Sequence, residues 1–251
     1  MDIEFMRAVG KTHVGNVREQ NQDAFFVSPA GPAPLPNLFV VADGLGGHKA
    51  GDVASKGALG VFCDFFDNYK SVKPLETCLV EALTKANEHI YLISQTNSDY
   101  DGMGTTFTAA TITPTSLHFA HVGDSRIYLI KTDGTMAQIT TDHTSTPEEI
   151  VADGLLTEDE AKKLPKKVLN RAVGTDDAVE IQKAAVRLEN VSHVLLCTDG
   201  LTDMLDDSKI LEIIMSGPGN NLDEIAEKLT NAALDAGGRD NISVIVIGWD
   251  S

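Results

Sequence analysis

The chain has 251 residues, of which 42% are hydrophobic and 23% charged, a balance typical of a globular protein with a sizeable core. Its 20 basic residues against 37 acidic ones give a net charge of −17. A field of that sign repels phosphate backbones and anionic lipids, which argues against nucleic acid or a membrane as the primary partner. Since we find no linker-like stretch or change of composition, we expect one domain spanning residues 1–251.

The start of the chain and the cysteines indicate where the protein works. The first residues have no long apolar run after a basic segment, and no apolar run approaches the roughly 20 residues of a membrane helix. The three cysteines, Cys63, Cys78 and Cys197, are widely spaced in apolar surroundings. This pattern favours buried thiols, with a Cys–His nucleophile as the alternative. We expect a soluble, cytoplasmic monomer.

The first half of the chain predicts two strands followed by two long helices. Residues 24–27 indicate a short strand, and the apolar run 38–41 a buried strand that ends in a tight turn at Asp43-Gly44. Apolar residues then recur at helical spacing over 52–69 and over 75–94. We expect both apolar stripes to face the core.

The middle of the chain is rich in β-branched residues, and two further strands are predicted before and after the last helices. Strands are predicted at 105–113, 117–122, 126–130 and 136–139, then at 194–197 and 242–247. We expect the first four to be sequential antiparallel neighbours, with a hairpin turn at Asp133-Gly134.

The later helices and one polar segment complete the prediction. Helices are expected at 208–215 and 222–236. The polar segment 141–167 shows short helical patterns and few apolar residues that could pack on the core, which is typical of a mobile loop. Strands in runs, without regular βαβ alternation, predict an α+β sandwich built on antiparallel sheets.

Acidic residues recur at the ends of the predicted strands. They are Asp23, Asp43, Asp124, Asp199 and Asp240. Carboxylates gathered in a core are costly unless a cation holds them, and ligand sets made of oxygen select hard ions such as Mg²⁺ or Mn²⁺. Each acid by itself can equally be a turn residue, and the residues alone leave both interpretations open.

An ordered set of motifs resembles one family. The motifs are RxxNQD (18–23), VADGLGGH (41–48), GTT (104–106), VGDSR (122–126), DH (142–143), NRAVG (170–174), TDG (198–200) and GRDN (238–241). Together they are similar to the metal-dependent protein phosphatases, the type 2C serine/threonine family, in its bacterial form. The resemblance covers nearly the whole chain, and the ordered set is far more specific than any one motif.

The resemblance implies a fold and a metal centre. The fold would be a four-layer αββα sandwich of two mainly antiparallel sheets flanked by helices. Asp43 would bridge two Mn²⁺ or Mg²⁺ ions, the carbonyl of Gly44 would bind one ion, and Asp199 and Asp240 the other. Asp124 would hold a weaker third ion together with Asp199, and Asp23 would hold metal-bound water behind the ligands.

The resemblance also implies a mechanism. A hydroxide that bridges the two ions would attack the phosphorus of a phosphoserine or phosphothreonine in line, while Arg18 clamps the phosphate oxygens. Two positions depart from the animal branch of the family. Leu45 stands where that branch has a proposed general acid, and Gln22 replaces an acidic residue, while His48 matches the bacterial pattern. The segment 141–167 corresponds to the family's variable flap.

Other functions are less consistent with these residues. A serine hydrolase would need glycine two residues after Ser125, where Ile127 stands, and residues 44–51 do not match the GxxxxGK(S/T) pattern of a P-loop. A nuclease is disfavoured by the net charge. The serious alternative is a pseudophosphatase, a regulatory module that binds phosphoproteins, but such proteins usually lose metal ligands. We therefore expect a phosphatase that opposes a serine/threonine kinase in bacterial signalling.

Overall fold

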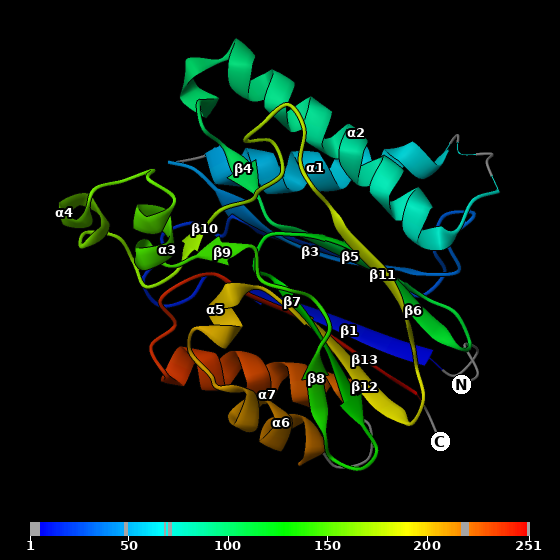
Figure 1. Ribbon diagram of the computed structural model, residues 1–251. Coiled ribbons are helices and arrows are strands. Elements are labelled where there is room, and N and C mark those ends of the chain that lie inside the picture. The colour runs from blue at the N-terminus through cyan, green and yellow to red at the C-terminus, as the bar shows by residue number, and fades with distance from the viewer. Residues whose placement is uncertain (1–5, 48–49, 68, 70–71, 217–220, 250–251) are drawn as a thin grey trace.

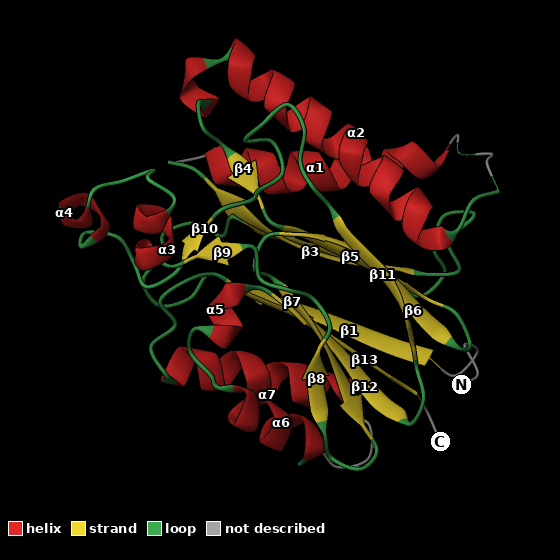
Figure 2. Cartoon of the chain, in the orientation of Figure 1, coloured by secondary structure: helices red, strands yellow, loops and turns green. Residues whose placement is uncertain are grey.

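Two antiparallel sheets pack face to face, and helices cover both outer faces (Figures 1 and 2). The computed structural model describes residues 6–47, 50–67, 69, 72–216 and 221–249. Within these ranges the strand orders are β1-β13-β12-β7-β8 in a five-stranded sheet and β11-β6-β5-β3-β2 in a six-stranded sheet, with β4 paired to β3. The αββα sandwich predicted from the sequence is confirmed.

Strands β2 to β6 all lie in one sheet, which β11 completes, and the other sheet combines strands from both ends and the middle of the chain. The six-stranded sheet contains β2 (Asp23–Ser28), β3 (Leu38–Leu45), β4 (Gly104–Thr105), β5 (Phe107–Ile112), β6 (Ser116–Val122) and β11 (Gln182–Arg187). The five-stranded sheet contains β1 (Met6–His13), β7 (Arg126–Lys131), β8 (Met136–Gln138), β12 (Val191–Cys197) and β13 (Ile242–Trp249).

The helices form the two outer layers and part of the flap. Helices α1 (Ala50–Asp67) and α2 (Leu75–Thr96), followed by the 3₁₀ turn η2 (Ser98–Tyr100), lie on the side of the six-stranded sheet. On the side of the five-stranded sheet lie α5 (Asp199–Thr202), α6 (Asp207–Met215) and α7 (Leu222–Asp235). The flap, residues 141–167, contains β9 (Thr144–Ser145), α3 (Pro147–Ala152) and α4 (Glu158–Ala161), and β9 pairs with β10 (Val168–Leu169) just after it. Among the described residues, no helix is long and apolar enough to cross a membrane.

Central strands are apolar on both faces because each face packs against another layer. In β3, Val40 and Ala42 join the core beneath α1 and α2, whereas Phe39 and Val41 join the core between the sheets. A third core lies between the five-stranded sheet and α6 and α7. This double burial explains why the run 38–41 shows no polar alternation. The same alternation turns Asp43 toward the gap between the sheets.

The predicted helices and the hairpin at Asp133-Gly134 are confirmed, but two predictions about the strands are wrong. Of the four middle strands, β5 pairs with β6 and β7 with β8 as expected, but β6 and β7 are not neighbours, because the chain crosses from one sheet to the other at Gly123, where φ is 111°. The prediction that Asp43-Gly44 is a turn also fails, since β3 continues to Leu45 and Gly44 pairs with Thr105 of β4. The prediction missed β1 and β11, whose polar, partly exposed sequences lack a buried strand's apolar run.

Candidate active site

The five predicted acids come from different parts of the chain, and only Asp23 and Asp43 lie within strands. Asp23 lies directly opposite Asp43 in the β2–β3 pair, so both side chains are on the same face. Asp43 and Asp199 are in side-chain hydrogen-bond contact. The charge of Asp240 acts on Asp23, and the charge of Asp199 acts on Asp124. The structure therefore brings together carboxylates that are up to 217 residues apart in sequence, Asp23 to Asp240.

Asp23 is a buried acid that links the two sheets. Its Oδ2 accepts hydrogen bonds from Thr198 Oγ1 (3.0 Å), after β12, and from Ser243 Oγ (2.6 Å), in β13. Its Oδ1 is buried and has no hydrogen-bond partner among the described residues. Burial raises the pKa of Asp23 to about 7 although both hydroxyl groups oppose the shift. One carboxylate oxygen is thus left for a water molecule or a ligand.

Asp43 is held by its backbone and crowded by other acids. Its carbonyl accepts hydrogen bonds from the Thr106 N–H (2.8 Å) and from Thr105 Oγ1 (2.9 Å). Burial raises the pKa of Asp43 well above its usual value, and the charges of Asp23 and Asp199 add to the effect. A carboxyl in this position ionises at a cost unless a cation lies beside it.

Only glycine fits at position 44, because the surrounding backbone leaves no room for a side chain. A Cβ at this position would lie 2.1 Å from the carbonyl oxygen of Gly51 at the start of α1 and 2.7 Å from that of Gln22. Any side chain here would push α1 away from the end of β3. The glycine therefore keeps β3, β2 and α1 in close backbone contact next to the acids.

Asp199 begins α5, immediately after β12. Burial raises its pKa to about 6, and the charges of Asp203, Asp240 and Asp23 contribute while its hydrogen bond with Asp43 opposes the shift. Asp199 Oδ1 is buried and, within the described chain, has no hydrogen-bond partner. Like Asp23, this acid keeps a free acceptor atom in a polar gap.

Asp124 lies where the chain crosses between the sheets, and a further acid that we did not predict accompanies it. Burial raises the pKa of Asp124 to about 7, and the charges of Asp199, Asp142 and Asp203 also contribute. Asp203 follows Asp199 by one turn, and its backbone N–H donates to the Asp199 carbonyl (2.7 Å). The i, i+4 spacing of the acids in DGLTD was the available signal for Asp203.

Arg18 faces the acids and pairs with one of them. Its guanidinium lies 2.7 Å from Asp240 Oδ2, and 53% of its side chain is exposed to solvent. The hydrogen bond to Asp240 raises the pKa of Arg18, and the charges of Asp240, Asp43 and Asp199 act in the same direction against burial. Without the family resemblance the sequence favours a surface salt bridge for Arg18, and its partner in the structure is a proposed metal ligand. The ion pair places a planar, exposed cation at the edge of the acidic cluster.

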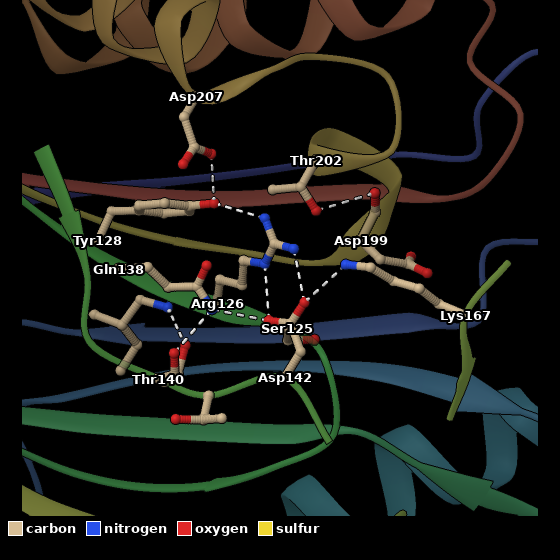
Figure 3. A network of polar contacts seen from close by, with 12 residues as sticks. Ser125, Arg126, Tyr128, Gln138, Thr140, Asp142, Lys167, Asp199, Thr202 and Asp207 are labelled. Atoms are coloured by element: carbon tan, nitrogen blue, oxygen red, sulfur yellow. Dashed lines mark hydrogen bonds and ion pairs between the residues drawn. The ribbon is translucent and has the colours of Figure 1, made fainter. Parts of the chain in front are cut away.

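A polar network supports the chain beside Asp124 (Figure 3). Arg126 donates two hydrogen bonds to Asp142 (2.9 and 2.7 Å) and one to the Tyr128 hydroxyl (2.8 Å), which donates to Asp207 (2.9 Å). Lys167 approaches Asp142 from the other side (3.3 Å). This network fastens both ends of the flap to β7 and to the start of α6.

The acidic cluster fits hard cations. Asp23 and Asp199 each have a carboxylate oxygen without a hydrogen-bond partner among the described residues. The pKa values of four carboxyl groups are also raised. Both observations indicate a site that would be stabilised by a bound cation. In the described ranges, no three acidic, histidine or cysteine side chains surround one point as the ligands of a single ion would. His48 of the sequence motif lies outside the described residues.

Known proteins resemble the chain over nearly its full length. The model of the protein phosphatase 2C family matches residues 9–235. The serine/threonine phosphatase stp of Listeria innocua is 34% identical over 249 residues, which cover 96% of this chain and 95% of that protein. The structure of serine/threonine phosphatase Stp1 from Staphylococcus aureus has a TM-score of 0.84 and 31% identity, with 98% and 96% of the two chains covered.

A second solved structure bears on the metal centre. The catalytic domain of the phosphatase PstP, in complex with two manganese ions, matches with a TM-score of 0.78 and 32% identity, covering 98% of this chain and 99% of that one. The sandwich fold, the gathered acids and the family match agree with one another. This chain belongs to the protein phosphatase 2C family.

Proposed function

We propose that this protein phosphatase hydrolyses phosphoserine and phosphothreonine in proteins, using Mn²⁺ or Mg²⁺. The observation that carries the proposal is the convergence of Asp23, Asp43 and Asp199 in a gap where two of their oxygens have no partner among the described residues. The relatives named serine/threonine phosphatases support the activity, and no observation favours a pseudophosphatase. The manganese ions of the PstP structure support the choice of metal.

We assign the metal ligands as follows. Asp43 and the Gly44 carbonyl, with Asp199 and Asp240, would hold two core ions, and Asp124, Asp199 and Asp203 would hold a weaker third one. Two such ions neutralise the charge of a phosphoryl group and make a nucleophile available from water near neutral pH. In this arrangement the free Oδ1 of Asp23 would accept a hydrogen bond from a water molecule at the metal centre.

The remaining chemistry falls to Arg18 and to solvent. When Asp240 is engaged elsewhere, the planar guanidinium of Arg18 is free to hold two phosphate oxygens, which offsets the repulsion between an anionic substrate and this acidic protein. Leu45, which follows Asp43-Gly44, cannot donate a proton. Water at the metal centre would instead supply the proton for the leaving serine or threonine oxygen.

A direct assay tests this function. Purified, metal-stripped protein is incubated with a phosphothreonine peptide, and released phosphate is measured with Mn²⁺, with Mg²⁺ and with excess chelator. We expect release with either ion, none with chelator, and much slower release from the matching phosphotyrosine peptide. Undiminished release in chelator would refute the metal-dependent mechanism.

Substitution of Arg18 by alanine should raise KM for a phosphopeptide by about tenfold or more, with a smaller change in kcat. A charge-assisted, two-pronged contact to phosphate contributes roughly 1.5–3 kcal/mol per hydrogen bond. Arg18→Lys keeps the charge but loses the planar fork, so it should recover part of the loss. An unchanged KM in Arg18→Ala would show that Arg18 does not bind the substrate phosphate and only forms its ion pair with Asp240.

Bound Mn²⁺ should stabilise the fold more near pH 8 than near pH 5.5. In the metal-free fold the pKa values of Asp23 and Asp124 are about 7 and that of Asp199 about 6, above the ordinary value of about 3.9. Their contribution to metal-free stability is therefore present at acid pH and lost as pH rises through about 6 to 7. Metal needs the ionised carboxylates, so its stabilisation grows over the same range.

Thermal melts with and without Mn²⁺ at both pH values measure this effect, because ionisations elsewhere in the fold contribute equally to the paired samples. Equal Mn²⁺-induced shifts at the two pH values would show that these carboxyl groups are not the ligands.

We also propose that residues 1–251 form one phosphatase domain with a flap at 141–167, since the family match and the structural matches run across it. Phosphoproteins are its substrate class. A counterpart serine/threonine kinase, a monomeric state and a cytoplasmic location remain predictions from the sequence.

A further inference from the structure

Thr106 lies at the break between β4 and β5 and satisfies both backbone groups of Asp43. Its N–H donates to the Asp43 carbonyl (2.8 Å), and its Oγ1 accepts from the Asp43 N–H (2.9 Å). Thr106 is 1% exposed, so water cannot replace these contacts. Thr106 therefore holds both backbone groups of Asp43, and the Thr105 hydroxyl group donates a second hydrogen bond to the Asp43 carbonyl.

The same hydroxyl group reaches the chain segment that carries Asp124. Thr106 Oγ1 lies 2.8 Å from Ser125 Oγ, and Ser125 is fully buried. Because Thr106 Oγ1 already accepts the Asp43 N–H, its own hydrogen is available for Ser125. Gly123, on the other side of Asp124, packs against the Thr106 side chain so closely that a Cβ there would lie 2.6 Å from Thr106 Cβ.

The crossing segment is also held from its opposite side. The His143 N–H donates to the Gly123 carbonyl (2.8 Å), and the Gly123 N–H donates to His143 Nδ1 (3.0 Å). Arg126, at the end of the segment, is fixed by Asp142. The segment from Gly123 to Arg126 is thus confined between the Asp142-His143 pair and Thr106.

We propose that Thr106 is a positioning residue that sets Asp43 relative to Asp124, through the hydroxyl pair that it forms with Ser125. This inference rests on the proposed function, because it concerns the same metal centre. It adds that the two acids, one in β3 and the other between β6 and β7, are held in register by a single buried hydroxyl group. Weakening of outer hydrogen bonds of this kind typically costs about 10- to 100-fold in metal affinity or activity.

The test compares Thr106→Val, which keeps the shape but removes the hydroxyl group, with Thr106→Ser, which keeps the hydroxyl group. Mn²⁺ binding to the metal-stripped proteins is measured by calorimetry at low temperature, where circular dichroism verifies folding, and kcat and KM are measured separately. We expect Thr106→Val to lose about 10- to 100-fold in Mn²⁺ affinity and in kcat with little change in KM. Thr106→Ser should restore most of both.

Thr230→Val is the matched control. Thr230 is also 1% exposed, and its hydroxyl group donates to the Ala226 carbonyl (2.9 Å) in α7, a helix that contains none of the five acids of the site. It should lower the melting temperature without changing Mn²⁺ affinity, whereas a positioning role at Thr106 changes the affinity of the folded protein. If Thr106→Val does not fold, Ser125→Ala provides the test, because it leaves the Thr106 contacts to Asp43 in place.

For Ser125→Ala we expect a several-fold loss of Mn²⁺ affinity. Wild-type Mn²⁺ affinity and kcat in Thr106→Val, or in Ser125→Ala where the first variant is unfolded, would overturn the inference. Failure of the wild-type protein to bind Mn²⁺ or to release phosphate would instead refute the proposed function itself. The two failures are therefore distinguishable.

Discussion

Asp43→Asn should abolish phosphate release, with a loss of more than about 100-fold, while the metal-free protein remains folded. The expected loss exceeds the 10- to 100-fold that follows when a group merely supporting a metal ligand is removed, because Asp43 is the proposed bridge between two ions. Activity is measured as phosphate release from a phosphothreonine peptide in saturating Mn²⁺.

The stability of this variant separates the role of Asp43 in metal binding from a role in folding. Burial and the charges of Asp23 and Asp199 raise the pKa of Asp43, so a neutral amide removes repulsion from the metal-free site. The amide can still donate a hydrogen bond to Asp199. We expect a metal-free melting temperature at pH 7.5 no lower than that of the wild type, and no further rise on adding Mn²⁺.

Asp67→Asn, at the exposed end of α1, is the matched control and should behave like the wild type. Wild-type turnover in Asp43→Asn, or a wild-type rise in melting temperature with Mn²⁺, would show that the metal centre is assigned to the wrong carboxylate.

Arg126→Met should lower the free energy of unfolding by about 3 kcal/mol, measured by urea unfolding in chelator. Arg126 and Asp142 form a two-pronged pair whose side chains are 17% and 14% exposed, and removing one member of a buried pair leaves the other charge without its partner. Lys167 and Gln138 also contact Asp142, which places the expected loss at the low end of the usual range of about 3–5 kcal/mol.

Two comparisons make this prediction specific. The double variant Arg126→Met/Asp142→Leu should recover part of the lost stability, because it removes the stranded carboxylate. Arg187→Met breaks an exposed pair with Glu189 and should change stability by less than about 1 kcal/mol. An effect of Arg126→Met as small as that of Arg187→Met would mean that the network in Figure 3 does not stabilise the fold.

Much of the site could be predicted because its chemistry is carried by residue types in short motifs. Asp43-Gly44 and Asp199-Gly200 each follow an apolar run. An aspartate that follows a buried strand lies near the end of that strand, whatever the order of the strands in the sheet. The oxygen-only ligand set likewise narrows the metal to hard ions. Asp203 was missed because its sequence context is that of an ordinary exposed helix residue. Only the structure shows that its charge acts on Asp199 and Asp124.

The fold class, the helices, the acids and the family resemblance follow from the sequence, because these depend on local periodicity and on ordered motifs. Which strands are neighbours is known only from the three-dimensional structure, since pairings such as β1 with β13 join opposite ends of the chain. The structure also shows that Asp43 lies within a strand, that Arg18 pairs with Asp240, and that Thr106 spans Asp43 and Ser125. Contacts of this kind depend on how the two sheets pack together, so short sequence patterns do not predict them.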